Sequence, residues 1–125
     1  MPDIPSPGRP VRGSDSGLPI MALLDLLGRR WALRVIWELR EETLTFRELQ
    51  ARCDRVSSSV LNQRLAELRA AGIAEPAGDG YQLTEEGERL LELSPPLQAW
   101  AERWAARERA GRRRPAARGA RRAGR

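Results

Sequence analysis

The stretch VSSSVLNQRLAELRAAG, residues 56–72, decides how the rest of the chain is interpreted. Its leucines recur at i, i+4 and i+7, a spacing that lines one face of a helix with apolar side chains. These leucines are Leu61, Leu65 and Leu68. Ser57 can cap the start by accepting a backbone N–H, and Gly72 can end the helix in a left-handed conformation. We therefore predict one amphipathic helix between Ser57 and Gly72.

The first turns of this predicted helix carry side chains that donate and accept hydrogen bonds. Asn and Gln side chains can pair bidentately with adenine in the DNA major groove, and Arg with guanine. An ordinary solvent-exposed helix would also be polar here, so the flanking sequence has to decide between the two interpretations. The candidate base-reading residues are Ser58, Ser59, Asn62, Gln63 and Arg64.

A shorter helix is predicted to start at Thr45, where Thr45 and Glu48 match the capping-box pattern. Residues 54–56 then form a tight turn. A helix, a short turn and a longer helix is the spacing of a helix-turn-helix, whose second helix enters the major groove. Residues at the helix starts and in the turn would contact the phosphate backbone. These candidates are Thr45, Arg47, Arg55 and Ser57.

Two short strands are predicted after this helix, at 73–75 and 81–83, with Asp79-Gly80 as a tight-turn signal. A hairpin that directly follows a recognition helix is a wing. This predicted wing has Asp79 at its tip and no Arg, so we expect little phosphate contact from it.

Further helices are predicted on both sides of these elements, at 18–27, 31–40, 84–94 and 95–107. The predicted fold is therefore mainly α with a small β-hairpin: a winged helix-turn-helix with an extra helix at each end. Trp31 and Trp37 of the second helix are expected to pack in the core.

The two end helices are candidates for contact with a second subunit. The first is more apolar than one small domain can cover. Trp100 and Trp104, one turn apart in the last helix, indicate either burial against a partner or closure of the domain's own core. The candidate dimer-interface residues are Leu23, Leu27, Leu97, Trp100 and Trp104.

Composition argues against catalysis and metal binding. The chain has no His and one Cys, which removes the commonest general base and metal ligand and any cysteine zinc cluster. No glycine-rich phosphate loop occurs, so we expect no enzyme activity, no metal and no cofactor. No apolar run reaches the ~18 residues of a membrane span, and no signal peptide is recognisable, so a cytoplasmic protein is expected.

Positive charge is concentrated at the C-terminal end. Residues 107–125 hold nine Arg and one Glu, a net charge of +8, whereas the chain as a whole carries +5. This segment could attract DNA phosphates or simply keep the chain soluble. We predict a disordered tail at 1–17, a winged helix-turn-helix DNA-binding domain at 18–107 and a disordered Arg-rich tail at 108–125.

The sequence resembles the HxlR-type winged helix-turn-helix transcriptional regulators, which are related to the MarR group. The motifs that carry the resemblance are DLLGRRW (25–31), FRELQ (46–50), VSSSVLNQRLAELRAAGI (56–73) and YQLTEEGERL (81–90). The resemblance implies a homodimeric repressor or activator that binds a pseudo-palindromic operator in double-stranded DNA, with dimer contacts from the first and last helices. It leaves room for a small-molecule effector without identifying one.

The chain departs from this family in its thiol. Members often carry a Cys ahead of the first helix, used by some as a redox or electrophile sensor, and Leu18 stands there in this sequence. The single thiol, Cys53, is expected to be buried and inert. A protein-interaction module on a winged-helix scaffold remains the alternative function, because a fold does not determine a function.

Overall fold

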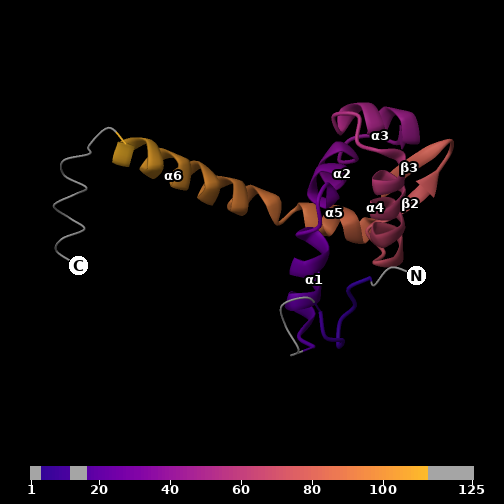
Figure 1. Cartoon of the computed structure of the whole chain (residues 1–125), viewed down its shortest axis with the longest axis horizontal. Helices are drawn as coiled ribbons and strands as arrows, with labels where there is room; N and C mark the ends of the chain where they lie inside the picture. The colour runs from indigo at the N-terminus through magenta and orange to yellow at the C-terminus, as the bar shows by residue number, and fades with distance from the viewer. Residues whose placement is uncertain (1–3, 12–16, 113–125) are drawn as a thin grey trace. The chain divides into compact units, whose positions relative to one another are not determined.

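The computed structural model describes residues 4–11 and 17–112. The chain divides after Leu91 into an N-terminal unit and a C-terminal unit, which are described separately. The elements are α1 (Pro19–Leu27), α2 (Ala32–Glu38), β1 (Leu44–Thr45), α3 (Phe46–Arg52), α4 (Ser58–Ala70), β2 (Ala74–Ala77), β3 (Gly80–Leu83), α5 (Glu85–Leu91) and α6 (Ser94–Arg112). The helices and the hairpin follow the predicted order (Figure 1), and a two-residue strand, β1, precedes α3.

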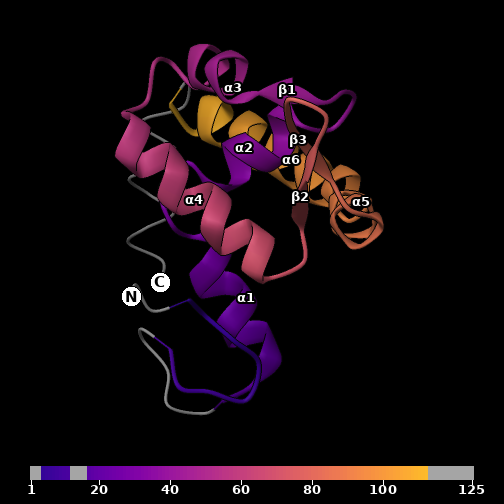
Figure 2. The ribbon, with the colours of Figure 1, turned by 90° about the vertical axis from the view of Figure 1, so that its right-hand side faces the viewer.

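The core of the N-terminal unit lies behind α4. The predicted apolar face of α4 is confirmed, because its three leucines are at most 2% exposed. They pack with apolar residues from α1, α2, α3 and the sheet. Figure 2 shows α4 crossing the front of this unit, with α3 above it and α1 below it. The leucine face therefore holds α4 on the unit and leaves its opposite face outside.

The helix caps predicted from the sequence are present. Thr45 and Glu48 form the reciprocal capping box at the start of α3. The Ser57 hydroxyl accepts the backbone N–H of Val60 at 3.3 Å, which starts α4. Gly72 ends α4 with φ +78°, and the N–H of Ile73 then donates to the carbonyl of Leu68 at 2.8 Å. These caps set both ends of α4.

The wing is the β2–β3 hairpin, and β1 adds a third antiparallel strand in the order β1-β3-β2. Ala77 pairs with Gly80, so the hairpin loop is Gly78-Asp79, one residue earlier than the predicted Asp79-Gly80 turn. Gly80 is needed for β1, because a Cβ there would lie 2.1 Å from the carbonyl oxygen of Leu44. The short β1 thus ties the wing to the start of α3.

The two tryptophans expected in the core differ in their burial. Trp31 packs against the core as predicted, but the core assignment of Trp37 was wrong. Trp37 is 39% exposed because it points away from the core, and the guanidinium of Arg40 covers part of its ring at 3.9 Å. Of the two predicted tails, the structure describes residues 4–11 within the N-terminal unit and the end of α6 up to Arg112. Residues 1–3, 12–16 and 113–125 of these tails lie outside the described residues.

The C-terminal unit contains α6, a single helix with no buried residue. Trp100 and Trp104 stack on each other with ring centroids 6.0 Å apart, and each remains about half exposed. Within the described residues, no helix combines the length and the apolar character that crossing a membrane would require.

Candidate nucleic-acid interface

The candidate interface consists of α3, a tight turn and α4. The turn bends sharply because Asp54 and Arg55 both adopt left-handed backbone conformations, with φ of 54° and 59°. The amide of Gln50 in α3 donates to the carbonyl of Val56 at 2.9 Å and to the hydroxyl of Ser58 at 3.2 Å. These two bonds hold the first turn of α4 against α3.

Most of the predicted base-reading side chains come together on one exposed face of α4. The exposed members are Ser58, Ser59, Asn62 and Gln63. This face contains no carboxylate, because the only acid of α4, Glu67, is 1% exposed. Side chains that donate and accept hydrogen bonds are thus presented outward without a negative charge that would repel DNA.

Two of the predicted phosphate-contacting residues lie beside the start of α4. Arg47 and Arg55 are exposed and line a hollow of about 500 Å³ together with Ser58. Among the described residues, no carboxylate lies within ion-pair distance of either Arg. The hydroxyls of Thr45 and Ser57 serve the helix caps as acceptors, and each still has a proton to donate.

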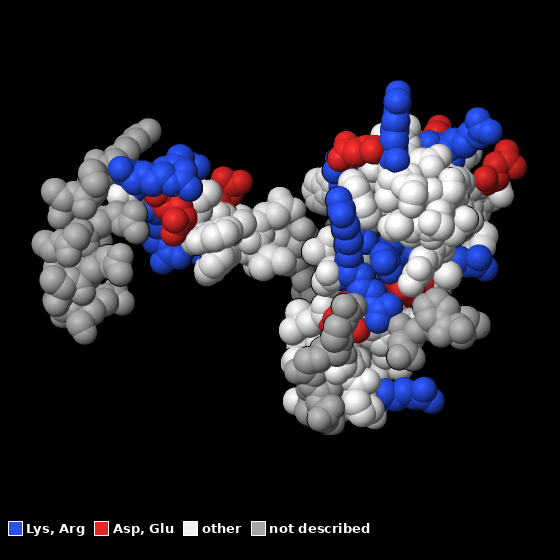
Figure 3. Space-filling model, in the orientation of Figure 1, with Lys and Arg blue, Asp and Glu red and all other residues white. Residues whose placement is uncertain are grey.

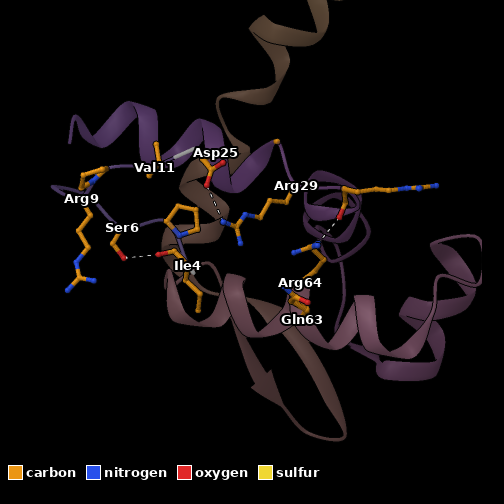
Figure 4. Close-up of a pocket in the computed structure, with 12 residues that line it drawn as sticks. Ile4, Ser6, Arg9, Val11, Asp25, Arg29, Gln63 and Arg64 are labelled. Atoms are coloured by element: carbon orange, nitrogen blue, oxygen red, sulfur yellow. Dashed lines mark hydrogen bonds and ion pairs between the residues drawn. The ribbon is translucent and has the colours of Figure 1, made fainter. Parts of the chain in front are cut away.

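Arg64 is not brought to this face. Its side chain is 14% exposed, its Nε donates to the carbonyl of Arg30 at 2.8 Å, and its Nη1 meets Glu67 Oε1 at 2.5 Å. The physical reason is helical geometry, because position 64 points toward the α1–α2 turn while its predicted companions point outward. Arg64 borders a hollow beside α4 that Arg29 also lines (Figure 4).

Sequence reasoning missed a buried charge network behind the interface. Glu67 accepts from Arg29 at 2.8 Å and from Gln63 at 3.3 Å, in addition to its contact with Arg64. Arg29 also pairs with Asp25 at 3.2 Å (Figure 4). Burial alone would raise the pKa of Glu67, but the hydrogen bonds from Arg64 and Arg29 outweigh it and lower that pKa. The network therefore keeps Glu67 ionised and ties α4 to the α1–α2 turn.

Arg69 was also missed as a candidate, although its spacing could have revealed it. It lies seven residues after Asn62 on α4 and is exposed. Seven residues are about two helical turns, so both side chains leave the same side of the helix. Arg69 therefore adds a positive charge to the far end of the exposed face.

The residues predicted to form a dimer interface are less exposed on α1 than on α6. On α1, Leu23 and Leu27 are half-buried, and Leu27 packs against the unit's own core. Ile20 and Leu24 of α1 are more than half exposed, as is Leu18 just before it. On α6, the candidates Leu97, Trp100 and Trp104 are 69%, 50% and 52% exposed.

Comparison with known proteins points to one family. The HxlR-like helix-turn-helix family model matches residues 26–109 of this chain. The HTH-type transcriptional regulator YodB of Bacillus subtilis (strain 168) is 33% identical over 86 residues, which cover 63% of this chain and 77% of YodB. The uncharacterized HTH-type transcriptional regulator YvaP of the same organism is 28% identical over 88 residues, covering 65% of this chain and 82% of YvaP.

Solved structures agree with these sequence relatives. The crystal structure of quinone-bound YodB from B. subtilis matches with a TM-score of 0.64 at 32% identity, covering 67% of this chain and 96% of YodB. A putative MarR-family transcriptional regulator from Enterococcus faecalis V583 matches with a TM-score of 0.66 at 25% identity, covering 80% of this chain and 97% of that regulator.

Proposed function

This chain belongs to the HxlR-like helix-turn-helix family and is a DNA-binding transcriptional regulator, and on that premise we propose that it reads a specific DNA sequence with the exposed face of α4. The observation that carries the proposal is the acid-free polar face of α4, flanked by two exposed arginines. Such a face can hydrogen-bond to base edges while the arginines neutralise phosphates.

The proposed roles follow the placement of the side chains. Base edges are read by Ser58, Ser59, Asn62 and Gln63. Phosphates are contacted by Thr45, Arg47, Arg55 and Ser57. Arg64 is left out of the base-reading set, because its guanidinium is already engaged by Glu67 and by the carbonyl of Arg30. If Arg64 moved to contact DNA, the buried carboxylate of Glu67 would lose one of its two arginine partners, which is unfavourable.

The experiment that tests this proposal selects genomic fragments with the purified full chain at moderate salt and measures their affinity by gel shift. We expect enriched fragments to bind at least about a thousandfold more tightly than random duplex, the lower end for specific regulators. Equal affinity for selected and random DNA would contradict the proposal and favour the protein-interaction alternative.

We further propose that the regulator acts as a homodimer on a pseudo-palindromic operator, with half-sites about one helical turn apart. The exposed apolar side chains of α1 and α6 support this, because large apolar patches are uncommon on the surface of a soluble monomer. Replacing Trp100 and Trp104 together with Ser is expected to shift the mass seen by analytical ultracentrifugation from dimer toward monomer. A wild-type chain that sediments as a monomer at micromolar concentration would reject the dimer.

Effector sensing through a cysteine is not proposed for this chain, although its relative YodB has been crystallised with a bound quinone. Cys53 is 0% exposed, and burial raises the pKa of its thiol. A buried thiol with a raised pKa forms little of the thiolate that reacts with electrophiles.

Cys53 is therefore expected to react with a thiol reagent such as DTNB at pH 8 at least about a hundred times more slowly in the folded protein than in denaturant, because reaction requires opening of the fold. Absorbance of the released thiolate measures both rates. Rapid labelling of the native chain, accompanied by a change in DNA affinity, would contradict this prediction and support a sensor role.

A further inference from the structure

Two hollows lie on different sides of the exposed face of α4. One is lined by Arg47, Arg55 and Ser58, and the other by Arg30 and Gln63 together with the buried network. Ser58 and Gln63 are five residues apart, which places them about 140° apart around the helix axis. The second hollow has a volume of about 920 Å³ and is lined on its far side by residues 4–6 and 9–11 (Figure 4).

Charge in the second hollow is only partly balanced. Arg29 and Arg64 are held by Asp25 and Glu67 through contacts of 2.5 to 3.2 Å. Arg30 is exposed, and among the described residues no carboxylate lies within 4.0 Å of its guanidinium. That guanidinium sits 5.7 Å from the ring centroid of Trp31. Figure 3 shows basic side chains, with acidic ones beside them, near the middle of the visible surface of the N-terminal unit.

The main chain at Arg30 is attached directly to α4. Its carbonyl accepts the Nε–H of Arg64 at 2.8 Å, and the next residue, Trp31, takes a left-handed conformation with φ 76° before α2 begins. Arg64 is in turn anchored by Glu67 on the same helix. The base of the Arg30 side chain therefore keeps its position relative to Gln63, which is a requirement for a contact that accompanies base reading.

We propose that Arg30 contacts a DNA phosphate on the Gln63 side of α4, as the counterpart of Arg47 and Arg55 on the Ser58 side. A helix in the major groove has a phosphate backbone on each side, and the wing, with Asp79 and no Arg at its tip, supplies no cation of its own. The inference rests on the proposed reading of DNA by α4. It assigns to the α1–α2 turn a role in backbone contact and none in base discrimination.

The test compares wild type, Arg30→Ala and Arg30→Lys by fluorescence anisotropy on a random 30-base-pair duplex and on a selected genomic fragment, each over a series of salt concentrations. Arg30→Ala is expected to weaken both complexes about three- to tenfold and to lower the slope of log affinity against log salt by about 0.9 for each phosphate that the variant no longer neutralises. Arg30→Lys keeps the charge and should restore most of the slope.

Arg89→Ala is the matched control, because it removes one positive charge from α5, where Glu85 and Glu86 already neutralise it. An Arg30→Ala slope equal to the Arg89→Ala slope would overturn the proposal. A second result would also overturn it. Inorganic phosphate would raise the melting temperature of wild type but not of Arg30→Ala, while Arg30→Ala left the slope of log DNA affinity against log salt unchanged. The hollow would then bind a small anion and not DNA. If the wild-type chain showed no sequence preference, base reading by α4 would be rejected. The salt slopes of wild type and Arg30→Ala on random duplex would still test the phosphate contact of Arg30.

Discussion

Replacing Glu67 with Gln is expected to lower the free energy of unfolding by about 3 kcal/mol at pH 7, a large share of the stability of a small domain. Glu67 is 1% exposed, and its carboxylate is the shared acceptor of Arg29 and Arg64. Glutamine has nearly the same shape but no charge, so two guanidinium groups would lose their counter-ion. The two arginines retain 12% and 14% exposure, which lets water compensate them in part and favours the lower end of the usual range of about 3–5 kcal/mol.

The same network predicts a dependence of stability on pH. The pKa of Glu67 is lowered in the folded chain from an ordinary value of 4.5. The unfolded chain therefore takes up the proton first as the pH falls, and the stabilisation is complete only above the unfolded value. The stability difference between wild type and Glu67→Gln should be largest near neutral pH and should shrink as the pH falls below about 4.5 toward the folded value.

Urea denaturation followed by circular dichroism at several pH values measures both effects. Glu88→Gln is the matched control, because Glu88 lies on the exposed surface of α5 and its loss should change stability by less than about 0.5 kcal/mol. If Glu67→Gln were as stable as Glu88→Gln at pH 7, the network would not hold α4 in place, and Arg64 would return to the set of residues that could read bases.

Asn62→Ala and Gln63→Ala are each expected to weaken binding to the selected operator by roughly 1–3 kcal/mol while binding to random duplex persists. Both side chains are exposed on the acid-free face of α4, where their amides can pair with adenine. Gln63 already donates one hydrogen to Glu67 at 3.3 Å, which leaves its carbonyl oxygen and its second hydrogen for a base.

Anisotropy titrations on operator and random duplexes give the specificity ratio directly. Gln98→Ala removes a similar amide from α6, where it donates to Ser94, and serves as the matched control. Melting temperatures show whether the variants remain folded. Equal losses on operator and random DNA would assign Asn62 and Gln63 to backbone contact and would remove them from the base-reading set.

The helix-turn-helix and its wing could be predicted because their signals are local. A capping box at Thr45, a serine cap at Ser57 and a left-handed Gly72 each depend on residues within a few positions in the chain. The leucine spacing of α4 depends only on helical periodicity, and the structure confirms that this face is buried. Local chemistry of this kind can be recognised before any tertiary contact is known.

The position of Arg64 could not be predicted in the same way. One of its two partners, Glu67, is three residues away in the sequence, whereas the other, the Arg30 carbonyl, is 34 residues away. In the sequence, Arg64 and Glu67 look like any solvent-exposed i, i+3 pair. Trp37 was misplaced for a similar reason, because its exposure depends on the direction in which α2 packs and on the cover supplied by Arg40.

The sequence by itself therefore determined the order of the elements, the limits of α4 and which of its faces carries leucines, since periodicity and capping act over one or two turns. Only the tertiary structure decided which polar residues remain available to DNA. It brought the α1–α2 turn against α4, so that the Arg30 carbonyl and Glu67 hold Arg64 away from the surface while the Arg30 side chain remains exposed. A buried carboxylate must be compensated by cations, and which cations reach it depends on how the helices pack.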